Sequence, residues 1–143
     1  MGTYEQILEQ WKQRHIRNDA ELAEALNGYG ILFAYHSGRI ENAQITYNDT
    51  REIFEHDGVT NYTGDLRTLF EIRNAKDAYE LLLKSFQKKR MLDETLLKKL
   101  HLRLTQNTYD TRRWQLGERP GEYKRHDFVT GRFEIGAPPD VVK

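Results

Sequence analysis

Ser37-Gly38-Arg39-Ile40-Glu41-Asn42 lies near the end of a segment whose apolar residues recur at helical spacing. Ser37 and Glu41 are four residues apart, so the sequence predicts that their side chains share one face of that helix. Asn42 follows at once. The hexapeptide therefore predicts a polar helix end that presents a hydroxyl and a carboxylate side by side.

Upstream, two helices are expected. Thr3 is placed to cap a short one, and Asn18 with Glu21 three residues later resembles a capping box that opens the helix running to residue 41. Gly28 and Gly30 interrupt this helix, which indicates either that another backbone packs closely there or that the helix breaks near Gly30. The apolar face expected to be buried consists of Leu22, Leu26, Tyr29, Leu32, Phe33, His36 and Ile40.

Downstream, three more helices are predicted. Thr46 or Asn48 begins a short helix over 49–55, and Gly58 is expected to supply its left-handed C-terminal residue. Thr63 is expected to cap the longest helix, which ends in the basic run 88–90. Asp93 is expected to cap another. The residues expected to face inward are Leu69, Ile72, Ala75, Tyr79, Leu82 and Phe86 on the longer helix, and Leu96, Leu97, Leu100 and Leu104 on the next.

After residue 105 the helical periodicity is lost. Glycine and proline mark an irregular loop up to about residue 125. Residues 126–135 then predict two short strands around Thr130-Gly131, and Asp140 opens a segment that resembles the start of a helix. The chain therefore has the pattern of an interrupted domain.

Composition narrows the class of protein. The 143 residues contain 22 Lys and Arg against 22 Asp and Glu, so the formal net charge is zero. This balance disfavours a nucleic-acid-binding protein, which usually carries a basic excess. Charged residues make up 31% of the chain and the mean hydropathy is −0.82. Two interpretations stay open: a small, highly charged helical protein, or a fragment whose apolar faces await further chain.

The sequence does not favour a secreted protein, a membrane protein or a metal-binding protein. The chain has no cysteine, no signal-peptide core and no apolar run near the roughly 18 residues of a membrane span, which predicts a cytoplasmic protein with no membrane contact. The histidines are scattered without metal-ligand spacing, and His101 is interpreted as a semi-buried residue with a hydrogen-bond partner. The basic cluster formed by 112–114 with 124–125 is interpreted as a solvated loop.

A family resemblance organises these motifs. Residues 37–42 resemble the inhibitory helix of Fic family proteins, in which a Ser or Thr is followed four residues later by Glu and a small polar residue. The later segments come in an order similar to that family, and the resemblance covers about residues 30–142. The matching segments are Ala43-Gln44-Ile45-Thr46 with the helix before Gly58, Glu71-Ile72-Arg73-Asn74-Ala75, Leu100-His101, Gly121-Glu122-Tyr123-Lys124 with Lys124 in place of the family's arginine, the hairpin, and Pro138-Pro139.

The resemblance implies a mainly α, Fic-type helical fold, seen as its N-terminal portion, with a β-hairpin flap. Residues 1–45 would be N-terminal helices that include the inhibitory helix, and 46–143 the N-terminal part of the Fic-type domain. Complete members transfer AMP from ATP to a protein hydroxyl with the help of Mg²⁺. Their catalytic motif, a His-Pro-Phe run followed two residues later by Gly-Asn-Gly-Arg, is not among these residues. No catalytic or metal-binding residue is therefore assigned, and the chain alone is expected to be inactive and to bind no cofactor.

The resemblance also implies roles for individual residues. Glu41 would pair with an arginine of the catalytic motif that otherwise grips the γ-phosphate of ATP, because a guanidinium binds carboxylate and phosphate in the same bidentate way. Ser37 would steady this brake by hydrogen bonding and Asn42 would anchor the helix end. The flap that would hold the target protein by strand pairing consists of Phe128, Val129, Thr130, Gly131, Arg132 and Phe133.

Two rival functions remain open. The chain could be a stand-alone, antitoxin-like binding module that supplies the inhibitory helix to a separate catalytic protein. It could also be a helical interaction protein with no link to nucleotides. The sequence leaves the target protein unidentified and a homo-oligomeric state open.

Overall fold

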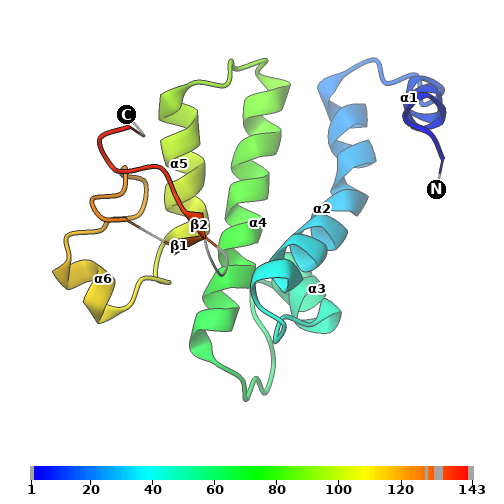
Figure 1. The fold of residues 1–143 in the computed structure, drawn as a ribbon. Coiled ribbons are helices and arrows are strands. Elements are labelled where there is room, and N and C mark those ends of the chain that lie inside the picture. Colours follow the sequence, from blue (N-terminus) through cyan, green and yellow to red (C-terminus); the bar gives the residue numbers. More distant parts are fainter. Residues whose placement is uncertain (1, 128, 131–133, 142–143) are drawn as a thin grey trace.

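The computed structural model describes residues 2–127, 129–130 and 134–141. The mainly α class is confirmed for these residues (Figure 1). The helices are α1 (Tyr4–Lys12), α2 (Asp19–Glu41), α3 (Tyr47–His56), α4 (Leu66–Gln87), α5 (Glu94–Thr105) and α6 (Thr111–Gln115), and the two short strands are β1 (Val129–Thr130) and β2 (Glu134–Ile135). Among the described residues no helix is both long and apolar enough to cross a membrane.

Helix α4 is the centre of the fold. Helices α2 and α5 pack along opposite sides of it, and α3 packs against both α2 and α4 (Figure 1). The buried cluster at this junction consists of Ile45, Ile53 and Ile72, with Tyr35, Val59 and Leu69 packed around it. The segment that follows α2 is thus tied to the centre of the molecule, and this fixes where α2 ends.

Most of the expected N-caps are confirmed. Thr3, Asn18, Thr46 and Asp93 each accept a hydrogen bond from a backbone amide of the first turn of their helix. At α2 the box is modified, because the Glu21 carboxylate accepts from the amide of Arg17 rather than from that of the cap itself. These local signals were sufficient because each cap involves residues close together in the sequence.

Two helix ends differ from the prediction. Asp65 caps α4, not Thr63, and its side chain accepts from the amide of Arg67. Asp57 takes the left-handed conformation at the end of α3, not Gly58. The Asp57 carboxylate lies 2.6 Å from Nζ of Lys76, and this hydrogen bond lowers the pKa of Asp57. Aspartate tolerates the left-handed region better than most residues, and the contact with α4 adds a partner that the local sequence does not reveal.

Helix α2 is continuous through both of its glycines. Gly28 has open space around it, whereas a Cβ at Gly30 would lie 3.0 Å from the ring of Tyr79 and 3.2 Å from the ring of Phe54. The close approach expected there is therefore made by aromatic side chains, not by another backbone. The Tyr79 hydroxyl also donates to the carbonyl of Leu26 at 2.7 Å, which joins α4 to α2.

The predicted burial of the helix stripes was wrong in part. On α2 the buried residues are Gly30 and Ala34, while most of the expected apolar face is exposed. On α4 and α5 the stripes are buried only where helices meet, as at Ile72 and Leu96. The large side chains expected inside but exposed in the structure are Tyr29, Leu32, Phe33 and Ile40 of α2, Leu82 and Phe86 of α4, and Leu97 and Leu104 of α5.

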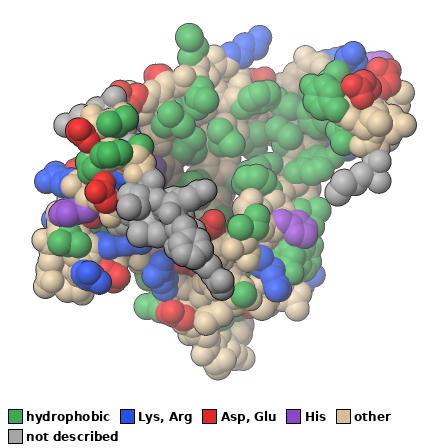
Figure 2. All heavy atoms as spheres, viewed as in Figure 1, with side chains coloured by type: hydrophobic (Ala, Val, Ile, Leu, Met, Phe, Trp, Pro, Cys, Tyr) green, Lys and Arg blue, Asp and Glu red, His purple; other side chains and the backbone are tan. Residues whose placement is uncertain are grey.

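These exposed side chains belong to α2, α4 and α5, of which α4 packs against the other two. Figure 2 shows hydrophobic side chains across the neighbouring surfaces of α5, α4 and α2. Phe33 and Tyr79 connect two of the stripes, with ring centroids 6.2 Å apart. We call the following set the exposed apolar face: Tyr29 and Phe33 of α2, Leu82 and Phe86 of α4, and Leu97 and Leu104 of α5.

The C-terminal segment contains one helix that was not expected. Helix α6 lies within the predicted irregular loop, where Asp110 caps it by accepting from the amide of Arg113. Beyond it, β1 and β2 pair antiparallel, with Val129 opposite Ile135 and Thr130 opposite Glu134. A turn spans 139–141, and the helix expected to begin at Asp140 falls largely outside the described residues. The division of the chain at residue 45 stays a prediction.

Candidate functional site

The last two turns of α2 carry the residues that the sequence singled out. Helix α2 ends at Glu41, and both Ser37 and Glu41 lie at the surface of its C-terminal half. Among the described residues, neither side chain makes a hydrogen bond or an ion pair. The bond expected from Ser37 is therefore not found in this part of the chain, and the Glu41 carboxylate is available to a cation from elsewhere.

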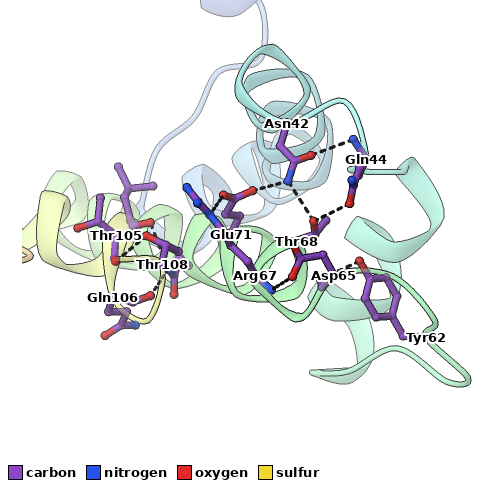
Figure 3. Close-up of polar contacts among 12 residues, drawn as sticks. Asn42, Gln44, Tyr62, Asp65, Arg67, Thr68, Glu71, Thr105, Gln106 and Thr108 are labelled. Carbon is purple, nitrogen blue, oxygen red and sulfur yellow. Dashed lines mark hydrogen bonds and ion pairs between the residues drawn. The ribbon is translucent and has the colours of Figure 1, made fainter. Parts of the chain in front are cut away.

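Asn42 anchors the end of α2, as expected. It is the C-cap, and its backbone amide donates to the carbonyl of Gly38 at 2.8 Å. Its side-chain Nδ2 donates to Oγ1 of Thr68 at 3.0 Å and to Oε2 of Glu71 at 2.6 Å, both on α4 (Figure 3). Its Oδ1 accepts from the amide of Gln44 at 2.9 Å. Every polar group of this side chain is therefore engaged.

The partners of Asn42 are themselves held in place. Glu71 Oε1 lies 3.0 Å from Nε of Arg67, one turn earlier on α4. Thr68 is 1% exposed, and its hydroxyl donates to Oε1 of Gln44 at 3.4 Å (Figure 3). We call Asn42 with Thr68 and Glu71 the Asn42 clamp. Sequence reasoning missed Thr68 and the role of Glu71, because 26 and 29 residues separate them from Asn42 and no local pattern connects them.

Gly38 allows the C-terminal end of α2 to pack closely against Ile45. A Cβ at this position would come within 2.8 Å of Cδ1 of Ile45, which is buried in the core cluster. The absence of a side chain lets the last turn of α2 pack against the segment that leads into α3. Gly38 and Asn42 together thus hold the helix end close to α4, with Glu41 directed to the surface.

The predicted flap is described only in part. Val129 and Thr130 form β1, whereas Phe128, Gly131, Arg132 and Phe133 lie outside the described residues. The pairing of β1 with β2 is two residues long on each side. Whether this segment serves as a flap stays a prediction.

A second polar cluster joins α5 to the segment before β1. The amide of Gly121 donates to Nδ1 of His101 at 2.9 Å, so the partner predicted for this histidine is present. Burial lowers the pKa of His101, and the neutral ring carries its proton on Nε2. Lys98 Nζ lies 4.3 Å from the centroid of the Tyr123 ring. These contacts attach the 121–124 turn to α5.

Glu118 organises the residues that lead into β1. Its buried carboxylate accepts hydrogen bonds from the amides of Arg125 and His126, at 2.9 and 3.0 Å, and lies 3.0 Å from Nδ1 of His126. Burial alone would raise the pKa of Glu118, but these hydrogen bonds outweigh it, so the pKa is lowered. Sequence reasoning missed this residue, because its partners lie seven and eight positions away and no local pattern connects them.

The remaining clusters consist of aromatic and charged side chains around α6. No group of three or more potential metal ligands occurs among the residues that the structure describes. Trp114 of the basic cluster is contacted by Arg119, which lies outside that cluster: the Arg119 guanidinium stacks on the Trp114 ring at 4.0 Å and donates to the Trp114 carbonyl. Arg113 lies over the Tyr109 ring at 5.1 Å. Several of these cations thus stabilise α6 and its loop.

The site is therefore a surface carboxylate on a helix end that is fixed to the central helix, next to an exposed apolar face. It can offer a carboxylate to a guanidinium. Comparison of the chain with protein-family models, with curated proteins and with solved structures finds no significant match.

Proposed function

We propose that this chain is the N-terminal regulatory and target-docking part of a Fic-family protein adenylyltransferase. In the complete protein, ATP and Mg²⁺ would bind at the catalytic motif, and AMP would pass to a hydroxyl of a target protein. Glu41 would act as the brake on that reaction. The chain described here would supply the brake and the docking surface but none of the groups that carry out the transfer.

The exposed apolar face is the observation that carries this proposal. The accessible surface of the chain is 11005 Å². A folded monomer of 16.9 kDa is expected to expose about 7,700 Å², so about 3,300 Å² is in excess. Part of this excess comes from α1, none of whose residues is buried, and part from the exposed apolar side chains of α2, α4 and α5. Three helices present apolar stripes that their own fold leaves uncovered, which supports the idea that further helices of the same domain pack on them.

The position of Glu41 supports the regulatory part of the proposal. Helical spacing places Phe33, Ser37 and Glu41 along one row of α2, so the carboxylate lies at one end of the exposed apolar face. A helix packed on that face could bring an arginine to it. The carboxylate would then compete with the γ-phosphate of ATP for the same guanidinium, and ATP would bind in an unproductive orientation.

The test is Glu41→Gly in the complete protein. Loss of the carboxylate frees the arginine, so autoadenylylation is expected to rise at least about tenfold, which corresponds to the roughly 1.4 kcal/mol of a modest charge-assisted interaction. Incorporation of labelled AMP measures it. Ile40→Gly is the matched control, because it places the same flexible residue in the same turn and keeps the carboxylate. Equal incorporation by the wild-type protein and Glu41→Gly would contradict the brake.

The docking role is tested at β1. Val129→Pro removes a backbone donor from the strand and fixes its φ, so strand pairing with a target segment should be lost. We expect modification of a protein target to fall below detection while ATP binding, followed by titration calorimetry, is unchanged. Val129→Thr, which keeps the donor and the β propensity, serves as the control. Target modification by the proline variant at the wild-type rate would exclude docking by this strand.

A further inference from the structure

The Asn42 clamp connects the proposed brake to the central helix. Glu41 and Asn42 are joined by one peptide bond, and the amide of Asn42 closes the last hydrogen bond of α2. The Asn42 side chain donates both of its Nδ2 hydrogens to residues of α4, one to the Thr68 hydroxyl and one to the Glu71 carboxylate. The position of Glu41 in space is therefore set by two residues that do not touch it.

The chemistry of the clamp suits asparagine in particular. Its amide is a double donor toward two acceptors, the Thr68 hydroxyl and the Glu71 carboxylate, and an acceptor toward the amide of Gln44. An aspartate would place a second carboxylate against Glu71, and an alanine would leave both acceptors without this donor. Thr68 is buried and Glu71 is paired with Arg67, so other contacts hold each acceptor in place beside Asn42.

We propose that Thr68 and Glu71 are positioning residues for the Glu41 brake, and that they act through Asn42. This inference rests on the proposed function. Helix ends open easily because their last carbonyls lack helical partners, and an unanchored last turn would let Glu41 sample many orientations. A brake that must meet one guanidinium needs a fixed carboxylate, so weakening the clamp weakens inhibition without removing the inhibitory group.

The first experiment measures the clamp in this chain by amide hydrogen exchange. Thr68→Val removes one acceptor with little change of shape. It also removes the longer hydrogen bond from the Thr68 hydroxyl to Oε1 of Gln44. We expect exchange at the amides of Asn42 and Gln44 to become at least about tenfold faster, because loss of even one hydrogen bond shifts a local opening equilibrium by about that factor. Thr50→Val is the matched control: Thr50 is equally buried and its hydroxyl bonds the Thr46 carbonyl in α3, away from Asn42. It should leave these two amides unchanged.

The second experiment measures autoadenylylation of the complete protein. Thr68→Val and Glu71→Ala should each raise it severalfold, and Thr68→Ser, which keeps the hydroxyl, should stay near the wild-type rate. The decisive readout is coupling. In a Glu41→Gly background the same substitutions should add nothing further, because there is no carboxylate left to position. A purely structural defect would lower activity in both backgrounds instead.

Each combined outcome of the two experiments supports or overturns the positioning role of Thr68 and Glu71. Faster exchange together with a rise that disappears in the Glu41→Gly background supports the inference. Unchanged exchange in Thr68→Val overturns the clamp itself. Faster exchange with wild-type activity, when Glu41→Gly does raise activity, overturns the positioning role alone. If Glu41→Gly leaves activity unchanged, the proposed function fails and this inference fails with it, whatever the exchange rates are.

Discussion

Asn74→Ala is expected to lower the free energy of unfolding of this chain by about 3 kcal/mol, and the melting temperature by roughly 9 °C. Asn74 lies on α4 and is 1% exposed. Its Nδ2 donates to the carbonyls of Leu104 and Gln106, at 3.2 and 2.7 Å, and so closes the C-terminal end of α5. The substitution removes both donors from carbonyls that have no helical partner and leaves a cavity between the two helices.

Urea denaturation followed by circular dichroism measures this effect. Asn48→Ala is the control, because Asn48 is exposed on α3 and a surface substitution of this kind should change stability by no more than about 0.5 kcal/mol. Asn74→Asp tests the mechanism further. A carboxylate facing two carbonyls should destabilise more than alanine at neutral pH. Protonation restores a donor, so part of the loss should be recovered as the pH falls below the carboxyl's raised folded-state pKa. Equal midpoints for Asn74→Ala and Asn48→Ala would show that α5 does not need this cap.

Local signals account for what the sequence predicted well. A cap such as Asn18 or Asp93 acts on amides two or three positions away, so its spacing is visible in the sequence. Asn42 was predictable as a helix end for the same reason. The errors at Thr63 and Gly58 also arose locally, because neighbouring residues offered equally good caps and contacts with α4 decided between them, as Lys76 does at Asp57.

Long-range contacts account for what was missed. Thr68 and Asn74 are polar residues in a helix whose periodicity marks neither as buried, yet each is buried because it satisfies the end of another helix. Such a pairing depends on which helices become neighbours, and that information is not contained in a helical repeat. The predicted burial of the apolar stripes was wrong for a related reason. Helical periodicity identifies the apolar side of a helix, but it does not show whether another element of the described chain packs on that side.

Charged substitutions in the exposed apolar face should have different effects on stability in the isolated chain and in the complete protein. Phe33 and Leu82 are 59% and 44% exposed here, so Phe33→Lys with Leu82→Lys should change the stability of the isolated chain by about 1 kcal/mol or less. If further helices cover this face in the complete protein that we propose, the same pair buries two charges and loses two apolar contacts. Each loss is then worth about 2 to 4 kcal/mol, enough together to unfold a domain of ordinary stability.

Thermal unfolding of the chain and of the complete protein, each with and without the two substitutions, makes the comparison. Tyr4→Lys with Leu66→Lys adds the same charge at side chains that are 74% and 64% exposed and lie outside the face, so it should be tolerated in both proteins. Tolerance of the Phe33 and Leu82 pair in the complete protein would mean that the proposed catalytic part does not pack on this face. The apolar face would then have to serve a separate partner, and the rival interpretation of a stand-alone module would gain the support that the present proposal loses.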